Sequence, residues 1–449
     1  MDATDLDHRA RTRSGCIPPE LVSRLLERGH VDVVELQAGR GEWFCALAWA
    51  RSLGEQGRQT RALEVLAPYL ATGWWTAVEA AAEMLEGWGR IDEAIEITRA
   101  RMEAGHPMAL ESHTRLLARH GRAQEAFTLL RPHIGEPALA VALADVAGAA
   151  GRDEEAAALL AARTEHECSD FPWCCRGLDR DTAIGLLATI RERQGRIDEA
   201  IALLRTGSDT LLNHRERLAA LLARHGRLDE LRQAAAADDS GYAVQQLAKL
   251  LEESGDAEGA IAAYRQARGA VADNTRTAFE LAQLLARHGR GNEAIAVMRR
   301  QADVWNGDDC ILHALSELYL DNGRPEDGLA HLDALAAARG GEEEWDLYWI
   351  RLPLIAARDG VDAAVAQARS HAEGGSWYAA PHIAELLAGA GRIEEAVAVL
   401  EPHPSMNSHD LAGYLIDLGR VPDALAILQQ RTPRPPEPVD GPWHDHPPF

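Results

Sequence analysis

The sequence predicts an all-α fold, a right-handed α-solenoid of about thirteen helix-turn-helix repeats. Thirteen turn glycines recur about every 32 residues between Gly29 and Gly419, and ten of them are followed directly by Arg. Apolar residues on both sides of each Gly keep the three-to-four spacing of helices. Leu and Ala also recur at fixed distances from the Gly. A period near ~34 residues is typical of paired helices that stack as a solenoid.

The segment Leu281–Val297 shows one repeat in its clearest form. Leu281 and Leu285 fall on one side of a first helix, and Gly289 can adopt the left-handed conformation that ends it. Glu293 and Ala294 then begin a second helix with its own apolar side. We expect the same turn at Gly29, Gly57, Gly89, Gly121, Gly151, Gly195, Gly226, Gly255, Gly289, Gly323, Gly360, Gly391 and Gly419.

On these residues the chain resembles the tetratricopeptide repeat (TPR) family. Leu281-Ala282, Gly289 and Ala294 match the family pattern, and the segment Gln194–Ile201 is the closest copy. The resemblance covers roughly residues 20–430. It departs from the family where Leu replaces the aromatic residue of the first helix and where the Pro that ends many repeats is absent. The resemblance implies that one face of the first helices lines a concave surface that holds peptides.

The order of segments along the chain is read from these repeats. We expect a flexible leader over residues 1–17, the solenoid over 18–430, and a Pro-rich extended tail over 431–449. A surplus of residues predicts a loop insert near 164–180. A degraded repeat lies near 341–372, where Pro353 replaces a small residue. Aromatic residues at helical spacing are predicted to be core: Trp43, Phe44, Trp49, Trp74, Trp75 and Trp88.

The composition excludes several classes of function. The formal net charge is −24, which disfavours nucleic acid and anionic membrane surfaces as partners. Lys249 is the only Lys and lies in a helical pattern, so no phosphate-binding loop is present. The first sixteen residues have no apolar core and six Cys do not form a disulfide framework. We therefore expect a cytoplasmic protein.

Few residues suggest chemistry. His166, Cys168, Cys174 and Cys175 form a dense group in the insert, which leaves a zinc site, a redox site and a plain packed loop open. The adjacent Cys174 and Cys175 make joint tetrahedral ligation awkward, so we expect no metal. His120, His225 and His288 recur before the turn and predict helix capping. No catalytic motif is found, so we expect no catalytic residues and no cofactor.

A stripe of positive and aromatic residues is the better candidate site. Positions two and six before each turn Gly share one side of the first helix. The predicted partner-binding residues there and beside them are Arg115, Arg119, Arg193, Arg224, Tyr242, Gln245, Lys249, Phe279 and Arg287. Arg51 and Arg358 occupy equivalent positions. The alternative is that these are solvated charges at helix ends that complement the helix dipole.

The sequence thus predicts a non-enzymatic scaffold or adaptor that holds a partner protein or peptide in its groove, through an acidic or C-terminal segment. One alternative is a regulatory or enzyme-associated subunit that uses the Cys-rich insert as a metal or redox element. Another is self-association through the solenoid ends into a homodimer.

Overall fold

The structure is a computed structural model. It describes residues 2–429 apart from 14, 165–176, 208–211, 238–239, 268–273, 306–307 and 340–343. Of the described residues 78% are helical, in 28 α-helices and one short 3₁₀ helix, and none of them forms a strand. The predicted all-α repeat fold is confirmed.

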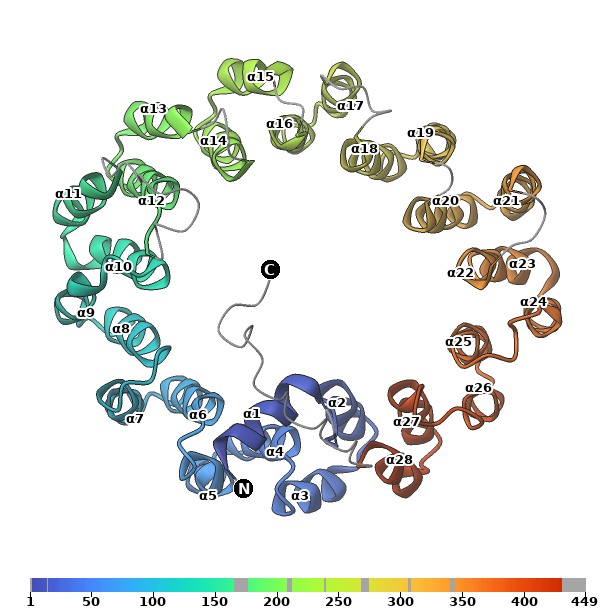
Figure 1. The fold of residues 1–449 in the computed structure, drawn as a ribbon, viewed down its shortest axis with the longest axis horizontal. Coiled ribbons are helices and arrows are strands. Elements are labelled where there is room, and N and C mark those ends of the chain that lie inside the picture. Colours follow the sequence, from blue (N-terminus) through green and yellow to red (C-terminus); the bar gives the residue numbers. More distant parts are fainter. Residues whose placement is uncertain are drawn as a thin grey trace, which may run out of the picture. The chain divides into compact units, whose positions relative to one another are not determined.

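The chain divides into two compact units, Met1–Trp88 with Ala380–Phe449 (unit 1) and Gly89–Ala379 (unit 2). Figure 1 labels the helices. Unit 1 contains α1 (Ala3–Thr12), α2 (Pro19–Glu27), α3 (Val31–Gly39), α4 (Trp43–Glu55), α5 (Gln59–Leu70), α6 (Trp75–Gly87), α25 (Ala380–Gly389), α26 (Ile393–Leu400), α27 (Ser408–Asp417) and α28 (Val421–Leu428).

Unit 2 contains the helices from α7 to α24. They are α7 (Ile91–Glu103), α8 (Ala109–Arg119), α9 (Ala123–Leu130), the 3₁₀ helix Arg131–His133, α10 (Pro137–Ala150), α11 (Asp153–Thr164), α12 (Arg180–Arg193), α13 (Ile197–Gly207), α14 (Leu212–Arg224), α15 (Leu228–Ala237), α16 (Tyr242–Glu253), α17 (Ala257–Gln266), α18 (Thr275–Arg287), α19 (Gly291–Val304), α20 (Asp309–Asp321), α21 (Pro325–Ala338), α22 (Trp345–Tyr348), α23 (Arg351–Asp359) and α24 (Val361–Ser370).

The turn glycines lie where the sequence predicts them. All thirteen have positive φ, and twelve of them separate two helices of ordinary length in the same way as Gly289, whose φ is 70°. The backbone N–H of Gly289 donates to the Ala286 carbonyl at 3.0 Å, and that of Arg290 donates to the Leu285 carbonyl at 2.8 Å. A left-handed residue that closes a helix in this way favours Gly because it has no Cβ. Gly360 differs, since its ψ of 161° leaves it extended.

Two rows of helices make up unit 2 (Figure 1). The first helices of its hairpins form the inner row, and the second helices lie outside them. The inner row consists of α8, α10, α12, α14, α16, α18, α20 and α23. Small residues allow the rows to approach closely, since Ala260 and Ala294 are fully buried at the same repeat position. Leu281 and Leu285 fill the space between the helices and are buried as well.

The N-terminal segment differs from the flexible leader predicted by its sequence. Residues 3–12 form α1, which Asp2 caps by accepting a hydrogen bond from the Asp5 N–H. Leu6 is buried, and Arg9 Nη2 lies 2.8 Å from Glu42 Oε1 at the start of α4. Contacts to residues far along the chain therefore hold a segment whose own sequence is mostly polar.

The first and last hairpins of the chain lie side by side in unit 1, where α2 contacts α27. Asp417 of α27 has a side chain that is only 7% exposed and accepts hydrogen bonds from two arginines of the first hairpin. Arg24 Nε lies 2.9 Å and Arg28 Nε 3.0 Å from Asp417 Oδ1. The terminal hairpins, considered above for self-association, therefore contact each other within unit 1.

The two predicted irregular regions are only partly described. Residues 165–176, which include His166, Cys168, Cys174 and Cys175, lie outside the described residues, as does the tail from 430 onward. After the insert, the Leu178 N–H donates to the Gly135 carbonyl at 2.6 Å. In the region of the degraded repeat, Pro353 lies in the first turn of α23, where a missing N–H costs no helical hydrogen bond.

Of the six aromatic residues predicted to be core, Trp43, Trp49, Trp74 and Trp75 are buried in unit 1. Phe44 and Trp88 are only half-buried. Across the described ranges, no helix is both long enough and apolar enough to span a bilayer.

Candidate functional site

The nine residues predicted to bind a partner lie on five helices of the inner row. Arg115 and Arg119 belong to α8, Arg193 to α12, Arg224 to α14, Tyr242, Gln245 and Lys249 to α16, and Phe279 and Arg287 to α18. The four arginines two residues before a turn Gly all fall in the last turn of their helices. Their binding of a partner remains a prediction, but the structure assigns most of these side chains partners within the chain.

Arg224 and Arg287 each form a two-pronged clamp on a Glu of the preceding hairpin. Arg224 donates Nε and Nη2 to the carboxylate oxygens of Glu192, at 3.0 and 2.9 Å. Arg287 donates the same two groups to Glu252, at 3.2 and 2.9 Å. Such fork-shaped pairing is the strongest geometry between Arg and a carboxylate. Each guanidinium keeps its Nη1 outside these bonds, and the two side chains are 57% and 53% exposed.

A histidine completes each clamp. His225 Nε2 lies 2.9 Å from Glu192 Oε1, and His288 Nε2 lies 2.9 Å from Glu252 Oε1. The backbone of His288 does take the C-cap position of α18, as the sequence predicts. Its side chain, however, contacts the preceding hairpin rather than the end of its own helix. The prediction of helix capping is therefore incomplete for His225 and His288, because a sequence pattern does not reveal a partner some 33 residues away.

Both clamps favour the ionised form of their Glu. Burial of Glu192 opposes ionisation, but the hydrogen bonds from Arg224 and His225 outweigh it, and the pKa of Glu192 is lowered. For Glu252 the hydrogen bond from Arg287 is the main cause, and its pKa is lowered too. Both carboxylates therefore carry their charge at neutral pH and keep the arginines in place.

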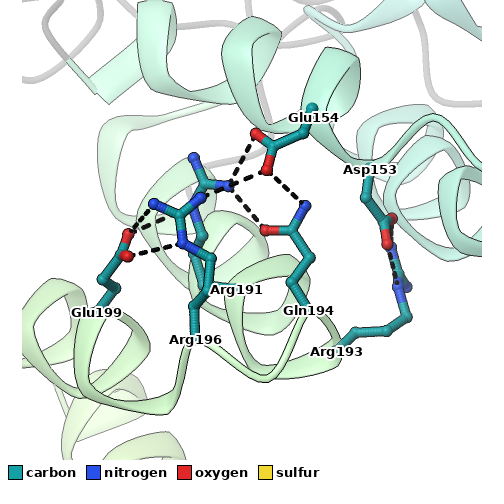
Figure 2. A network of polar contacts seen from close by, with 7 residues as sticks. All are labelled: Asp153, Glu154, Arg191, Arg193, Gln194, Arg196 and Glu199. Carbon is teal, nitrogen blue, oxygen red and sulfur yellow. Dashed lines mark hydrogen bonds and ion pairs between the residues drawn. The ribbon is translucent and has the colours of Figure 1, made fainter.

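Arg193 is held differently, around the hairpin of α10 and α11 (Figure 2). It forms an ion pair with Asp153, and its Nη2 donates to the Ala144 carbonyl oxygen at 2.9 Å. Gly148 makes room for this side chain, because a Cβ there would lie only 2.7 Å from Arg193 Nε. Arg193 therefore joins two hairpins and is less available to a partner than Arg224 or Arg287.

The Arg that follows a turn Gly makes a second repeated contact, which the sequence analysis did not identify. Arg196 donates Nε to Glu199 of its own hairpin at 2.6 Å, and Nη1 to Glu154 of the preceding one at 3.4 Å (Figure 2). We name such contacts the turn staples. Equivalent turn staples connect Arg152 with Gln124, Arg227 with Asp198, Arg290 with Glu258, and Arg324 with Asn292.

The turn staples account for five of the ten Arg residues that follow a turn Gly. The sequence signal is an Asp or Glu four residues after a turn Gly, together with a polar residue three residues after the preceding one. Each Arg of a turn staple bonds to the preceding hairpin, whereas Arg90, Arg122 and Arg392 bond to a Glu three residues further along their own repeat. The turn staples join neighbouring repeats of the stack.

The middle of the inner row carries aromatic and polar side chains. The Arg276 guanidinium lies 4.4 Å from the centre of the Tyr242 ring, a cation–π contact between α18 and α16. Gln245 Nε2 donates to Glu280 Oε1 at 2.7 Å, joining the same two helices. Phe279 is half-buried beside them, and Lys249 is an exposed residue on α16.

The other arginines of the stripe also lie close to carboxylates. Arg115 Nη1 lies 2.9 Å from Asp145 Oδ2 of α10. Arg51 lies 3.8 Å from Glu83, and Arg358 lies 2.7 Å from its neighbour Asp359. The positive stripe read from the sequence is thus largely neutralised within the chain, and the alternative of structural helix-end charges accounts for part of it.

The described thiols do not resemble active-site cysteines. Burial raises the pKa of Cys16 to about 11 and that of Cys45 to about 12, so both remain protonated. Cys310 is exposed, but the negative charge of Asp309 raises its pKa as well. Asp308, Asp309 and Cys310 are the one group with metal-ligand spacing in the described part of the chain, and all three are exposed.

Comparison with known proteins gives similarity in fold. No protein-family model matches the sequence, and the search of curated proteins finds no significant match. The solved structures that are similar to the chain include three with the following overlap. One is a structure of Naa15/Naa10 bound to HypK-THB, with 17% sequence identity and a TM-score of 0.45, in a match that covers 91% of this chain and 67% of that one. The second is the pentatricopeptide repeat protein PPR10 from maize, with 15% identity, a TM-score of 0.33, and coverage of 90% of this chain and 76% of that one. The third is the APC/C hetero-tetramer Cut9-Hcn1, with 11% identity, a TM-score of 0.26, and coverage of 85% of this chain and 91% of that one.

Proposed function

We propose that this protein is a non-enzymatic helical-repeat scaffold that holds a segment of a partner protein on the inner row of unit 2. The observation that carries the proposal is the pair of clamps at Arg224 and Arg287. Each guanidinium is fixed by its internal Glu and keeps one N–H edge that is exposed and outside the clamp. A side chain that is already ordered loses less entropy when a partner binds.

The chemistry of this row suits an acidic or C-terminal segment. A partner carboxylate would bond to the Nη1 edges, while apolar residues of the same segment would contact Tyr242 and Phe279. Aromatic residues and Arg are the side chains that contribute most at protein interfaces. The net charge of −24 supports a protein partner over nucleic acid or an anionic membrane. The proposal includes a cytoplasmic location and no catalytic group.

Two double substitutions, one of the arginines and one of their internal glutamates, test the proposal by peptide binding. A partner is first purified from the native host, and its contacting segment is made as a labelled peptide. Replacing Arg224 and Arg287 together by Ala should weaken binding by roughly tenfold, since two partly exposed charged contacts are lost. Replacing Glu192 and Glu252 together by Gln should also weaken binding, though by less, because each Arg then loses the charged clamp that holds it in place.

A matched control uses an Arg outside the proposed surface. Arg290→Ala removes a turn staple from unit 2 and should leave the affinity unchanged. If the double Arg variant and the double Glu variant both bind the peptide as the parent does, while their melting curves remain normal, the clamps are purely structural and the proposal is wrong.

A further inference from the structure

Unit 1 contains a cavity that the inner row does not account for. It has a volume of about 500 Å³ and lies among α3, α4 and α5, a size within the usual range of ligand pockets. Its apolar lining includes Trp49, Val65, Pro68 and Tyr69, and its charged lining consists of Glu35, Arg40, Arg61 and Glu64. Trp49 and Tyr69 form the buried floor of this space, while Pro68 and charges of both signs lie at its exposed rim.

Part of that charge is not paired with any residue that the structure describes. Arg61 and Glu64 form an ion pair at 2.9 Å. The side chains of Glu35 and Arg40 are exposed, and neither has a hydrogen bond or ion pair with any residue that the structure describes. Leu36, one residue along α3, is 52% exposed. The cavity therefore offers one free charge of each sign, with an apolar side chain near them.

The described chain ends beside the same helix. Gln429, which follows α28, donates Nε2 to Gln37 Oε1 of α3 at 2.8 Å, and Gln37 is buried. Residues 430–449 continue from this point. Seven of these 20 residues are Pro, and charged residues of both signs flank the densest Pro cluster.

We propose that the cavity of unit 1 is a docking site for the chain's own Pro-rich segment, residues 433–440. Proline-rich segments bind aromatic-lined grooves because they already adopt the polyproline II conformation and lose little entropy. The segment carries Arg434 before its Pro pair, and Glu437 and Asp440 after it. These charges complement Glu35 and Arg40 at the cavity.

The residues that follow Gln429 are long enough to reach across one helix. A polyproline II chain advances ~3.1 Å per residue, so the seven residues from 430 to 436 span roughly 20 Å, enough to pass over a helix about 10 Å wide. A site filled from the same chain also needs little intrinsic affinity, because a short tether gives an effective concentration in the millimolar range. The docking would cover the exposed apolar surface of α3 and α5.

Photo-crosslinking in the full chain tests which segment occupies the cavity. A benzophenone amino acid replaces Val65, which is half-buried in the cavity lining, or Ala67, an exposed residue of α5 outside it. We expect Val65→benzoylphenylalanine to give a crosslink within one chain to a peptide from 430–449, and the Ala67 variant to give none. A crosslink between two chains would assign the site to a second copy, and no crosslink to 430–449 would also overturn the proposal.

A binding measurement tests the same proposal without placing a bulky benzophenone side chain in the cavity. In a full chain whose Pro433, Pro435, Pro436 and Pro438 are replaced by Ser, the cavity should bind a labelled 430–449 peptide at least tenfold more tightly than the parent does. Adding Arg40→Glu should abolish that gain, whereas Arg58→Glu, an exposed Arg nearby that does not line the cavity, should not. Equal binding by the parent and the Ser variant would show that the tail does not compete for the site.

Discussion

Replacing Asp417 by Ala tests the contact between the first and last hairpins of unit 1. The carboxylate accepts charged hydrogen bonds from Arg24 and Arg28, and its side chain is 7% exposed. Burial opposes its ionisation, but the hydrogen bond and charge of Arg24 hold its pKa below the usual value. Its stabilisation is therefore present above the ordinary Asp pKa of about 3.9 and is lost as pH falls through the lower folded value.

The size of the effect follows from the exposure of the partners. A hydrogen bond to a charged group contributes about 1.5–3 kcal/mol when it is well buried. Arg24 and Arg28 are 36% and 55% exposed, so after the substitution water can solvate them and neither remains as a buried unpaired charge. We therefore expect Asp417→Ala to lower the free energy of unfolding of unit 1 by about 2 kcal/mol, near the middle of that range, at neutral pH.

Hydrogen exchange measured by mass spectrometry is the direct assay, because it reports on each helix. Amides of α2 and α27 should lose protection, while those of α12 to α19 should not change. Asp410→Asn is the matched control, since Asp410 is exposed on the same helix and has no ion pair with a described residue. If Asp417→Ala exchanges like Asp410→Asn in α2, the terminal hairpins do not stabilise each other, and the reasoning fails.

Three further predictions concern the repeats. Ala294→Leu should destabilise by ~1–3 kcal/mol in urea unfolding, because Ala294 is fully buried between helices; an unchanged midpoint would mean that the repeat register is wrong. Arg290→Ala should lower the melting temperature slightly at low salt and not at 1 M salt, where exposed ion pairs are screened, while Arg300→Ala on the same helix should have no effect at either. Burial lowers the pKa of His113 below its unfolded value of about 6.5. The contribution of His113 to stability is therefore complete above that pH and is lost as pH falls. Between pH 7.5 and 5.5 the urea midpoint of the parent should fall by more than that of His113→Gln, and an equal change in both would contradict this.

The sequence predicts the repeats well because their determinants are local. A turn Gly, an Ala at a helix crossing and a Leu eight residues before the Gly all act within one hairpin, so Gly289, Ala294 and Leu281 are found where their pattern places them. The same reasoning fails for α1. Its sequence has one buried apolar residue, Leu6, and its contacts lie with Glu42 and Trp74, the residues that precede α4 and α6.

The sequence predicts where the arginines of the candidate site lie, but not which carboxylates they pair with. Counting back from a turn Gly identifies Arg224 and Arg287 as equivalent residues, and both do lie at the ends of inner-row helices. That each one meets a Glu of the preceding hairpin depends on how two hairpins stack, which is a property of tertiary structure. A net charge of −24 makes a carboxylate neighbour common along this chain, and this explains why the positive stripe is largely neutralised.

We propose that a partner segment binds on the inner row of unit 2. Photo-crosslinking from Phe279 tests it most directly, because Phe279 lies on α18 of that row, whereas Arg300 is exposed on α19 of the outer one. A benzophenone amino acid at each position would be activated in cells of the native host, and the crosslinked proteins identified by mass spectrometry. We expect a partner protein crosslinked through one defined segment from position 279 and not from position 300. The same crosslinks from both positions, or from position 300 alone, would contradict the account.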